Sequence, residues 1–224
     1  ENYQKLLQSL TKEHPFWNNT DLAYEIILQG ILSCEWEQGD RVPQDQLANM
    51  LEMSRTPIRD ACARLVEENY LERDDKNSCR VVQVRLKDYI DFCEYRNCLE
   101  FRATYLAARN INDEQLEALR LNLEQFKQAE AAGDLRKALS LDNEFHIIIA
   151  KASKNKFLYE TIRDLSRRKS FYLHILVQRP SFKFVVNKHT AIYEAIKANN
   201  EAVAEDMMRS HLDFYVSNIG NVSI

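Results

Sequence analysis

Glycine and proline are scarce in this chain of 224 residues, which contains only four of each. Few residues can therefore interrupt regular structure, and we expect a folded, helix-rich protein with short loops. No apolar run approaches the roughly 20 residues that a membrane-spanning helix needs. The polar start, ENYQKLLQSLTKEH, lacks the apolar core of a secretory signal peptide. These absences predict a cytoplasmic protein and argue against a membrane protein.

The chain also has few cysteines and no net positive charge. The five cysteines are odd in number and lack the close pairing of zinc knuckles, which indicates reduced thiols rather than disulfides or a cysteine-based metal site. The net charge of −4 gives no overall basic excess for nucleic acid. Charge can still be concentrated on one face, so the placement of the arginines decides whether DNA is a partner.

The stretch 44–68, QDQLANMLEMSRTPIRDACARLVEE, has the spacing of two short helices joined by a tight turn. In its second half, apolar residues recur every three or four positions and gather on one side of a helix. The opposite side carries Arg55, Thr56 and Arg59 close to the helix start, where Ser54 or Thr56 can cap and Pro57 fits the first turn. Spacing alone leaves two interpretations open: a helix-turn-helix that enters the DNA major groove, or two packed surface helices.

The residues that follow favour the first interpretation. Asn69 can end a helix, and 70–73 and 79–84 predict two strands joined by the polar turn 74–78. With a leading helix over 22–33, the pattern predicts a winged helix-turn-helix. Residues 47–72, LANMLEMSRTPIRDACARLVEENYLE, closely resemble the DNA-binding signature of the GntR family of bacterial transcription regulators, and the resemblance covers most of the first 84 residues.

We expect five residues to contact DNA: Arg55 and Arg59 at base edges, Ser54 and Thr56 at phosphates, and Arg64 more weakly at a phosphate.

The sequence departs from the family pattern in three places. Glu52 replaces the turn glycine, which predicts a strain of about 1 kcal/mol if the left-handed backbone is kept. The arginine that often precedes the Leu-Ala pair is absent. The wing has no glycine, and Asp74 and Asp75 would repel phosphates, so we do not expect this wing to contact DNA.

The second half of the chain predicts an all-α antiparallel bundle without strands. Asn112 and Gln115 indicate a capping pair at one helix start. We expect a mainly α protein with an N-terminal extension over 1–20, a winged helix over 21–86 and a helical domain over 87–220. Phe16 and Trp17 indicate that the extension packs on something, either in this chain or in a partner subunit. The expected helices of the bundle are 88–110, 112–132, 134–153, 157–178, 182–198 and 201–218.

Asp142 and His146 lie four residues apart, so they share a helix face, and their apolar neighbours turn that face inward. His189 and His211 lie on apolar faces of two further helices. Each histidine alone can be a core residue satisfied by a carbonyl or carboxylate. One aspartate and three histidines together suit a divalent transition metal, with zinc, nickel and manganese all compatible.

This spacing is similar to the FCD effector domain that accompanies GntR-type winged helices in the FadR subfamily. The resemblance covers about 87–216 and is strongest in 141–155, 188–200 and 207–212. It implies that Asp142, His146, His189 and His211 hold a metal that anchors a small carboxylate effector. Arg96 and Asn155 match family positions near the effector. Arg96 can instead pair with Glu100 one turn away, and Asn155 can be a helix C-cap.

The leading hypothesis is a homodimeric transcription regulator, of the repressor type usual in this family, that reads a palindromic operator and is not an enzyme. The first alternative is a metal-dependent hydrolase on a helical bundle, for which His174 and Glu144 are the remaining candidates for a general base. The second is a winged-helix DNA-binding protein whose histidines are purely structural.

Overall fold

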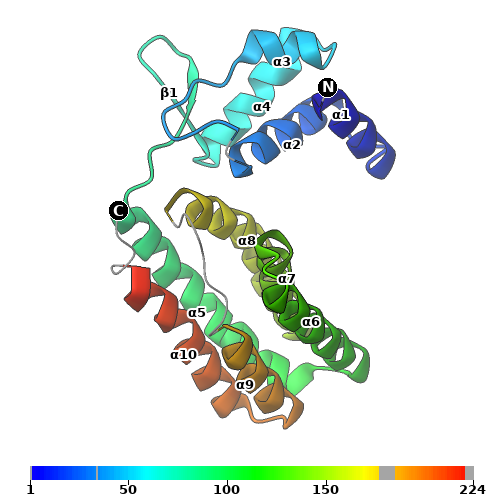
Figure 1. The fold of residues 1–224 in the computed structure, drawn as a ribbon, viewed down its shortest axis with the longest axis vertical. Coiled ribbons are helices and arrows are strands. Elements are labelled where there is room, and N and C mark those ends of the chain that lie inside the picture. Colours follow the sequence, from blue (N-terminus) through cyan, green and yellow to red (C-terminus); the bar gives the residue numbers. More distant parts are fainter. Residues whose placement is uncertain (1, 34, 177–184, 220–224) are drawn as a thin grey trace. The chain divides into compact units, whose positions relative to one another are not determined.

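The computed structural model describes residues 2–33, 35–176 and 185–219, apart from the side chains of 2, 173–176 and 214–219 (Figure 1). The chain divides into two compact units, Glu1–Val84 and Arg85–Ile224. The described residues are mainly helical, with one small sheet of two strands. The mainly α fold class predicted from the sequence is confirmed.

The first unit is a winged helix-turn-helix preceded by one further helix. Its strands pair in antiparallel register, with Leu71 opposite Val81, and a single bridge joins Arg41 to Arg80 on the other side of the second strand. The sheet lies beside a core built from α2, α3 and α4. The elements are α1 (Asn2–Glu13), α2 (Asn19–Leu32), α3 (Gln44–Met50), α4 (Arg55–Glu67), β1 (Leu71–Arg73) and β2 (Cys79–Val81).

Three details of this unit differ from the sequence-based expectation. The extension is largely helical, because 2–13 form α1, and its aromatic pair is not buried as a pair: Phe16 is 98% exposed while Trp17 stacks on His14 at 3.8 Å. The second strand ends at Val81 instead of 84. Helix α2 begins earlier than expected, because Asn18 and Asp21 form a reciprocal capping box.

Left-handed backbone occurs where the sequence indicated it. Glu52, in the turn between α3 and α4, has φ 53°, and Asn69, just after α4, has φ 55°. In the wing the left-handed residue is Asn77, with φ 59°. Asparagine tolerates this region better than most residues, so the wing turns without glycine.

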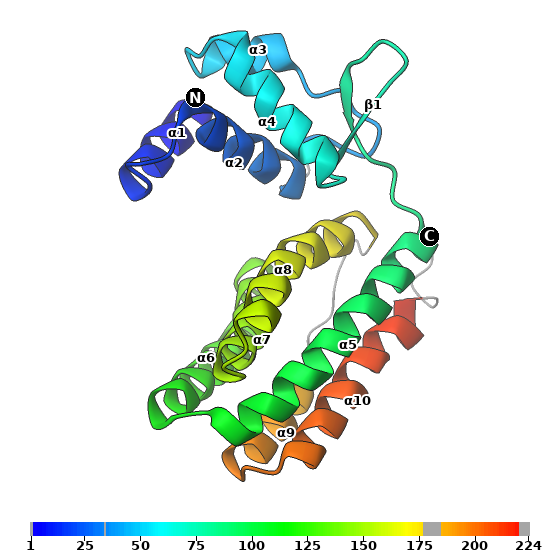
Figure 2. The same cartoon turned by 180° about the vertical axis from the view of Figure 1, so that it is seen from behind.

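The second unit is a bundle of six helices among the described residues (Figures 1 and 2). The long helix α5 packs against four others, α7, α8, α9 and α10, and α6 packs against α7 and α9. The predicted capping pair is present, since Asn112 Oδ1 accepts from the Gln115 backbone N–H at 2.8 Å. The helices are α5 (Leu86–Asn110), α6 (Asp113–Ala131), α7 (Leu135–Ala152), α8 (Lys156–Leu176), α9 (Val185–Lys197) and α10 (Glu201–Ile219).

The connection between α8 and α9 includes residues 177–184. The expected helix end at Gln178 and helix start at Phe182 therefore lie outside the described residues. Within the described part of the chain, no helix is both long and apolar enough to cross a membrane.

Candidate metal centre and nucleic-acid interface

Three helices of the second unit bring one aspartate and three histidines together. Asp142 and His146 project from the same face of α7, His189 comes from α9, and His211 comes from α10. All four are buried, with at most 1% of each residue exposed. One ligand atom from each lies within 4.8 Å of the others. The four residues that the sequence pointed to thus form one cluster in the bundle core.

The spacing of the ligand atoms suits a metal ion. His211 Nε2 lies 3.2 Å from His146 Nε2 and 3.3 Å from His189 Nε2, and His189 Nε2 lies 3.4 Å from Asp142 Oδ1. Bonds of 2.0–2.1 Å to a tetrahedral ion place neighbouring ligands about 3.3–3.4 Å apart. Asp142 Oδ1 is buried without a hydrogen bond, which is costly unless something else satisfies it. Three imidazoles and one carboxylate therefore fit a divalent transition metal.

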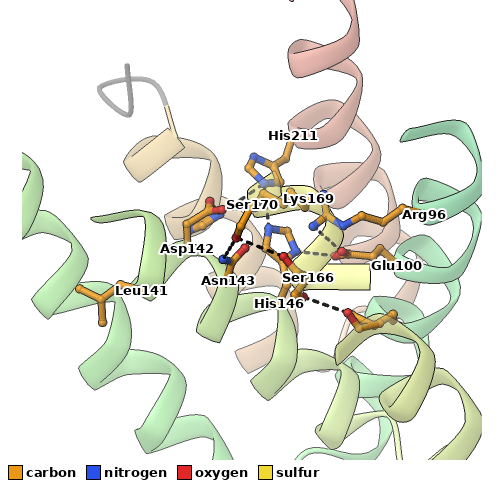
Figure 3. A network of polar contacts seen from close by, with 12 residues as sticks. Arg96, Glu100, Leu141, Asp142, Asn143, His146, Ser166, Lys169, Ser170 and His211 are labelled. Carbon is orange, nitrogen blue, oxygen red and sulfur yellow. Dashed lines mark hydrogen bonds and ion pairs between the residues drawn. The ribbon is translucent and has the colours of Figure 1, made fainter. Parts of the chain in front are cut away.

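A further set of buried polar groups supports the cluster from α5 and α8 (Figure 3). His146 Nδ1 contacts the Glu100 carboxylate, which pairs through its other oxygen with Arg96. When Nδ1–H donates to a carboxylate, the Nε2 lone pair is left facing the cluster. On the other side, Lys169 Nζ pairs with Asp142 Oδ2, so Oδ1 remains directed to the histidines.

Burial sets the protonation states that a metal requires. It lowers the pKa of His146 and of His211 well below the ordinary histidine value, and it lowers the pKa of His189 to about 4. Burial alone would raise the pKa of Asp142, but Lys169 and then His189 outweigh it and hold that pKa below its ordinary value. Neutral imidazoles and an ionised carboxylate are the forms that bind metal.

The sequence left two interpretations of Arg96 open, an effector contact and a pair with Glu100. It is ion-paired with Glu100 on the next turn of α5, as one interpretation predicted, and only 4% of it is exposed. Its Nε and Nη2 atoms are also buried without a hydrogen bond. A guanidinium in that state has donors available for a carboxylate.

Asn155 has a different position from the one expected of a C-cap. It precedes α8, and its Oδ1 accepts from the backbone N–H groups of Phe157 and Leu158 at 3.1 and 3.2 Å. The side chain therefore caps the start of α8. It is exposed, whereas the histidine cluster is buried, so this geometry does not bring Asn155 to the candidate metal centre.

Of the two residues considered as a general base for a hydrolase, the structure describes the side chain of Glu144. Glu144 is exposed and accepts a hydrogen bond from Asn122 Nδ2 at 3.3 Å, on another face of α7 from Asp142 and His146. The side chain of His174 lies outside the described residues. The described geometry therefore offers no support for a general base beside the cluster.

Sequence reasoning missed Lys169 and understated Glu100. Lys169 follows two other basic residues in RRKS, and nothing in that local sequence separates the buried cation from its neighbours. Glu100 was recognised only as a partner of Arg96, four residues away. Its contact with His146 depends on how α5 packs against α7, which the sequence pattern does not specify.

In the first unit, the start of α4 exposes the residues predicted to contact DNA. Ser54, Arg55, Thr56 and Arg59 are all exposed, and the last three line a hollow together with Gln44 and Asp45 of α3. Ser54 occupies the N-cap position but makes no side-chain capping bond. Arg55 pairs with Asp45 at 3.1 Å, with 81% of the arginine side chain exposed, so solvent screens this pair.

Arg64 and the wing aspartate serve contacts within the unit. Arg64 pairs with Asp21 of α2 at 2.8 Å and lies over the Tyr24 ring at 4.4 Å, which ties α4 to α2. Asp74 accepts from the Ser78 backbone N–H at 2.8 Å and from Arg80 Nε at 2.9 Å. The backbone bond from Ser78 contributes most to lowering the pKa of Asp74. Asp74 thus shapes the turn of the wing.

Comparison with known families gives two matches that together cover most of the chain. The profile described as "Bacterial regulatory proteins, gntR family" matches residues 19–81, and the "FCD domain" profile matches residues 91–214.

Similar proteins carry regulatory names. The "Nta operon transcriptional regulator" of Aminobacter aminovorans is 33% identical over 142 residues, which are 62% of this chain and 66% of that protein. The "Uncharacterized HTH-type transcriptional regulator YdhC" of Bacillus subtilis is 26% identical over 196 residues, 85% of this chain and 86% of that one. The solved structure titled "E. coli McbR/YncC" superposes with a TM-score of 0.79 at 23% identity, over 92% of this chain and 99% of that one. That last likeness shows a shared fold.

Proposed function

The chain belongs to the GntR family of bacterial regulatory proteins, with an FCD domain as its second half, and from this premise we propose a metal-dependent, effector-controlled repressor. It is a transcription regulator of the GntR type by family. The finer proposal is that its helical domain binds a divalent transition metal and a small organic acid, and that this binding changes its affinity for an operator.

One observation carries the proposal for the helical domain. Asp142, His146, His189 and His211 converge from three helices, with all four residues buried. A core of packed aliphatic side chains would have been the less costly way to fill this space, because buried polar groups need partners. A bound divalent ion would supply that partner and would present an electrophilic position to a carboxylate. Arg96, with unsatisfied donors, would bind and orient the same carboxylate.

The exposed start of α4 supports the proposed DNA contacts. Arg55 and Arg59 would read base edges in the major groove, and Ser54 and Thr56 would bind phosphates. Arg64 is the weaker phosphate candidate, because its guanidinium is already paired with Asp21. We propose that two copies of the chain bind a palindromic operator as a homodimer, since a two-fold axis presents two recognition helices to matching half-sites.

Regulation follows if the ligand favours one arrangement of the helices over another. The candidate ligands lie on α7, α9 and α10, and their supporting partners lie on α5 and α8. Occupancy of the site therefore restrains five helices of the bundle together. An effector can change operator affinity only by the difference in its affinity for the two states of the regulator.

Operator binding with defined metal content tests the proposal. A binding sequence is first selected from random duplex DNA, and affinity is then measured by fluorescence anisotropy for chelator-treated and nickel-loaded protein, each with and without small carboxylates. We expect at least one carboxylate to change the affinity of the nickel-loaded protein by about fivefold or more, a typical size for allosteric coupling, and to leave the chelated protein unchanged. Equal affinities under all these conditions would refute metal-dependent regulation.

A further inference from the structure

Two buried cations flank the candidate metal centre, and their combined charge restricts the ligand. Resting on the function proposed above, we propose that Lys169 makes this pocket selective for a small dicarboxylate dianion over a monocarboxylate. Lys169 is on α8 and Arg96 is on α5, and each is 4% exposed. Figure 3 shows both side chains directed toward the polar network around His146 and Asp142.

Lys169 has capacity for a ligand beyond its contact with the cluster. An ammonium has three donors, and Asp142 Oδ2 accepts from Lys169 Nζ. Among the described contacts, Asp142 Oδ2 is the one hydrogen-bond partner of Lys169 Nζ, and the hydroxyls of Ser166 and Ser170 donate to backbone carbonyls at 2.9 and 3.2 Å. The remaining donors of Lys169 are therefore suited to an acceptor that enters with the ligand.

Arg96 has unused donors as well. Its Nε is buried without a hydrogen bond, whereas Nη2 is in ion-pair contact with Glu100. The buried donors come from two different helices, α5 and α8. Two separated donor groups are better matched by an anion with two carboxylates than by a single carboxylate.

Charge balance leads to the same ligand class. Arg96 pairs with Glu100 and Lys169 pairs with Asp142, and imidazoles bind a metal in their neutral form, so the protein groups of a loaded site sum to zero. A divalent ion brings the sum to +2. Uncompensated charge in a protein interior is costly. A monocarboxylate leaves one positive charge uncompensated, whereas a dianion brings the sum back to zero.

The test compares acids that differ by one charge at nearly constant shape. Malonate, succinate and glutarate are titrated calorimetrically into nickel-loaded protein, beside their monoamides malonamate, succinamate and glutaramate. We expect at least one dicarboxylate to bind tenfold or more tightly than its own monoamide. Sulfate is included as a dianion without carboxylates, and we expect it to bind more weakly than that dicarboxylate. If every monoamide binds as well as its dicarboxylate, or if sulfate binds as tightly as the best acid, the proposal is wrong.

Variants assign the effect to Lys169. Lys169→Met removes the buried charge with similar volume and should reduce the preference to threefold or less, while Lys169→Arg should retain it. Lys151→Met removes an exposed lysine from α7 and serves as the matched control that should behave as wild type. Retention of the full preference in Lys169→Met contradicts the proposal, as does loss of bound nickel in that variant, which would mean that Lys169 serves to hold Asp142 for the metal.

The wild-type titrations do not depend on how well the variants fold. They also separate this inference from the proposed function. Failure of the wild-type protein to bind nickel, zinc or manganese would refute the metal site and this inference with it. Nickel binding with an operator response to a monocarboxylate, but no preference for any dianion, would overturn the charge argument alone.

Discussion

Protonation at three histidines determines how the second unit responds to acid. Each of these side chains is buried and has a pKa below the ordinary histidine value because burial disfavours the charged ring. Their Nε2 atoms approach one another closely, so protonating one ring places a charge against its neighbours. Protonation of this cluster should therefore destabilise the second unit when no metal is bound.

The first prediction concerns the pH dependence of stability in the metal-free protein. The unfolded histidines take up protons near pH 6.5, whereas folded His189 does so only near pH 4. Because the folded pKa is the lower one, the unfolded state binds more protons between these values. Stability is therefore fully present above pH 6.5 and is lost as pH falls toward 4. Each such histidine contributes a slope of up to about 1.4 kcal/mol per pH unit.

Urea unfolding of chelator-treated protein, followed by circular dichroism between pH 7.5 and 4.5, measures this slope. The buried carboxylate does not interfere in that range, since the pKa of Asp142 is lowered and its protonation occurs at more acidic pH. The His211→Gln variant should show a shallower slope. Stability that is constant over the whole range would show that the histidines are not buried in the neutral form.

Arg59 is the residue for which DNA contact can be tested most simply. It lies on the exposed side of α4, with 69% of its side chain exposed, and its nearest carboxylate, on Asp60, is 3.9 Å away. Arg59→Ala should weaken operator binding by about 1–3 kcal/mol, the size of a base contact, without unfolding the unit. Fluorescence anisotropy with the selected operator gives the value.

Arg109→Ala is the matched control, because Arg109 is similarly exposed, at 64% of its side chain, but belongs to the helical unit. It should bind the operator as wild type does. Normal binding by Arg59→Ala would mean that α4 meets DNA with another face.

At the scale of elements, the turn between α3 and α4 carries strain that its sequence reveals. Glu52 has a left-handed backbone, φ 53°, with its N–H directed to the Asn49 carbonyl at 3.3 Å, and Met53 N–H bonds the Ala48 carbonyl at 3.0 Å. This hydrogen-bonded turn ends α3 and fixes the start of α4. A residue with a Cβ is unfavourable there, so the unit sacrifices some stability to keep the geometry of its recognition helix.

We predict that Glu52→Gly stabilises the first unit by about 0.5–1 kcal/mol, because relief of the left-handed strain exceeds the added freedom of glycine in the unfolded chain. Both tryptophans of the chain, Trp17 and Trp36, lie in this unit, so their fluorescence during urea unfolding reports on it. Gly39→Ala is the opposite control. Gly39 has φ 83°, and its substitution should destabilise the same unit by about 1 kcal/mol. A destabilised Glu52→Gly protein would show that Glu52 makes a stabilising contact that outweighs the strain.

The sequence predicted elements better than it predicted contacts between them. Periodicity was sufficient for the bundle helices, and the Asn112 and Gln115 cap is confirmed, because both depend on residues within one or two turns. Helix α1 was missed because its polar, short amphipathic pattern resembles that of an exposed extension. The short wing strands were overestimated because β2 continues in sequence as an apolar alternation after its pairing ends at Val81.

At the candidate site the same distinction holds. The i and i+4 spacing identified Asp142 with His146, and the apolar faces of two further helices added His189 and His211, which the structure brings together. Lys169 could not be recognised, because only the packing of α8 against α7 separates this buried ammonium from the more exposed basic residues before it. Polar residues that act across helices need tertiary structure to be identified.

At the scale of the whole molecule, the two units suit separate tasks. The first unit exposes a recognition helix, and the second contains a buried polar cluster that a packed helical core does not require. A regulator needs both: a surface that binds DNA, and an interior that changes when a signal binds. The metal is the central claim, because the effector pocket, the role of Lys169 and the acid sensitivity are all argued from the same four side chains.

Metal analysis tests that claim most directly. Wild-type protein, His146→Ala and His211→Ala are each treated with chelator, supplied separately with zinc, nickel or manganese, desalted and analysed for bound metal and helical content. The account predicts about one ion per chain in the wild type, loss of that ion in both variants, and retained helicity in all three proteins. A wild type that binds no metal under any supply, or variants that retain a full ion, would contradict the account.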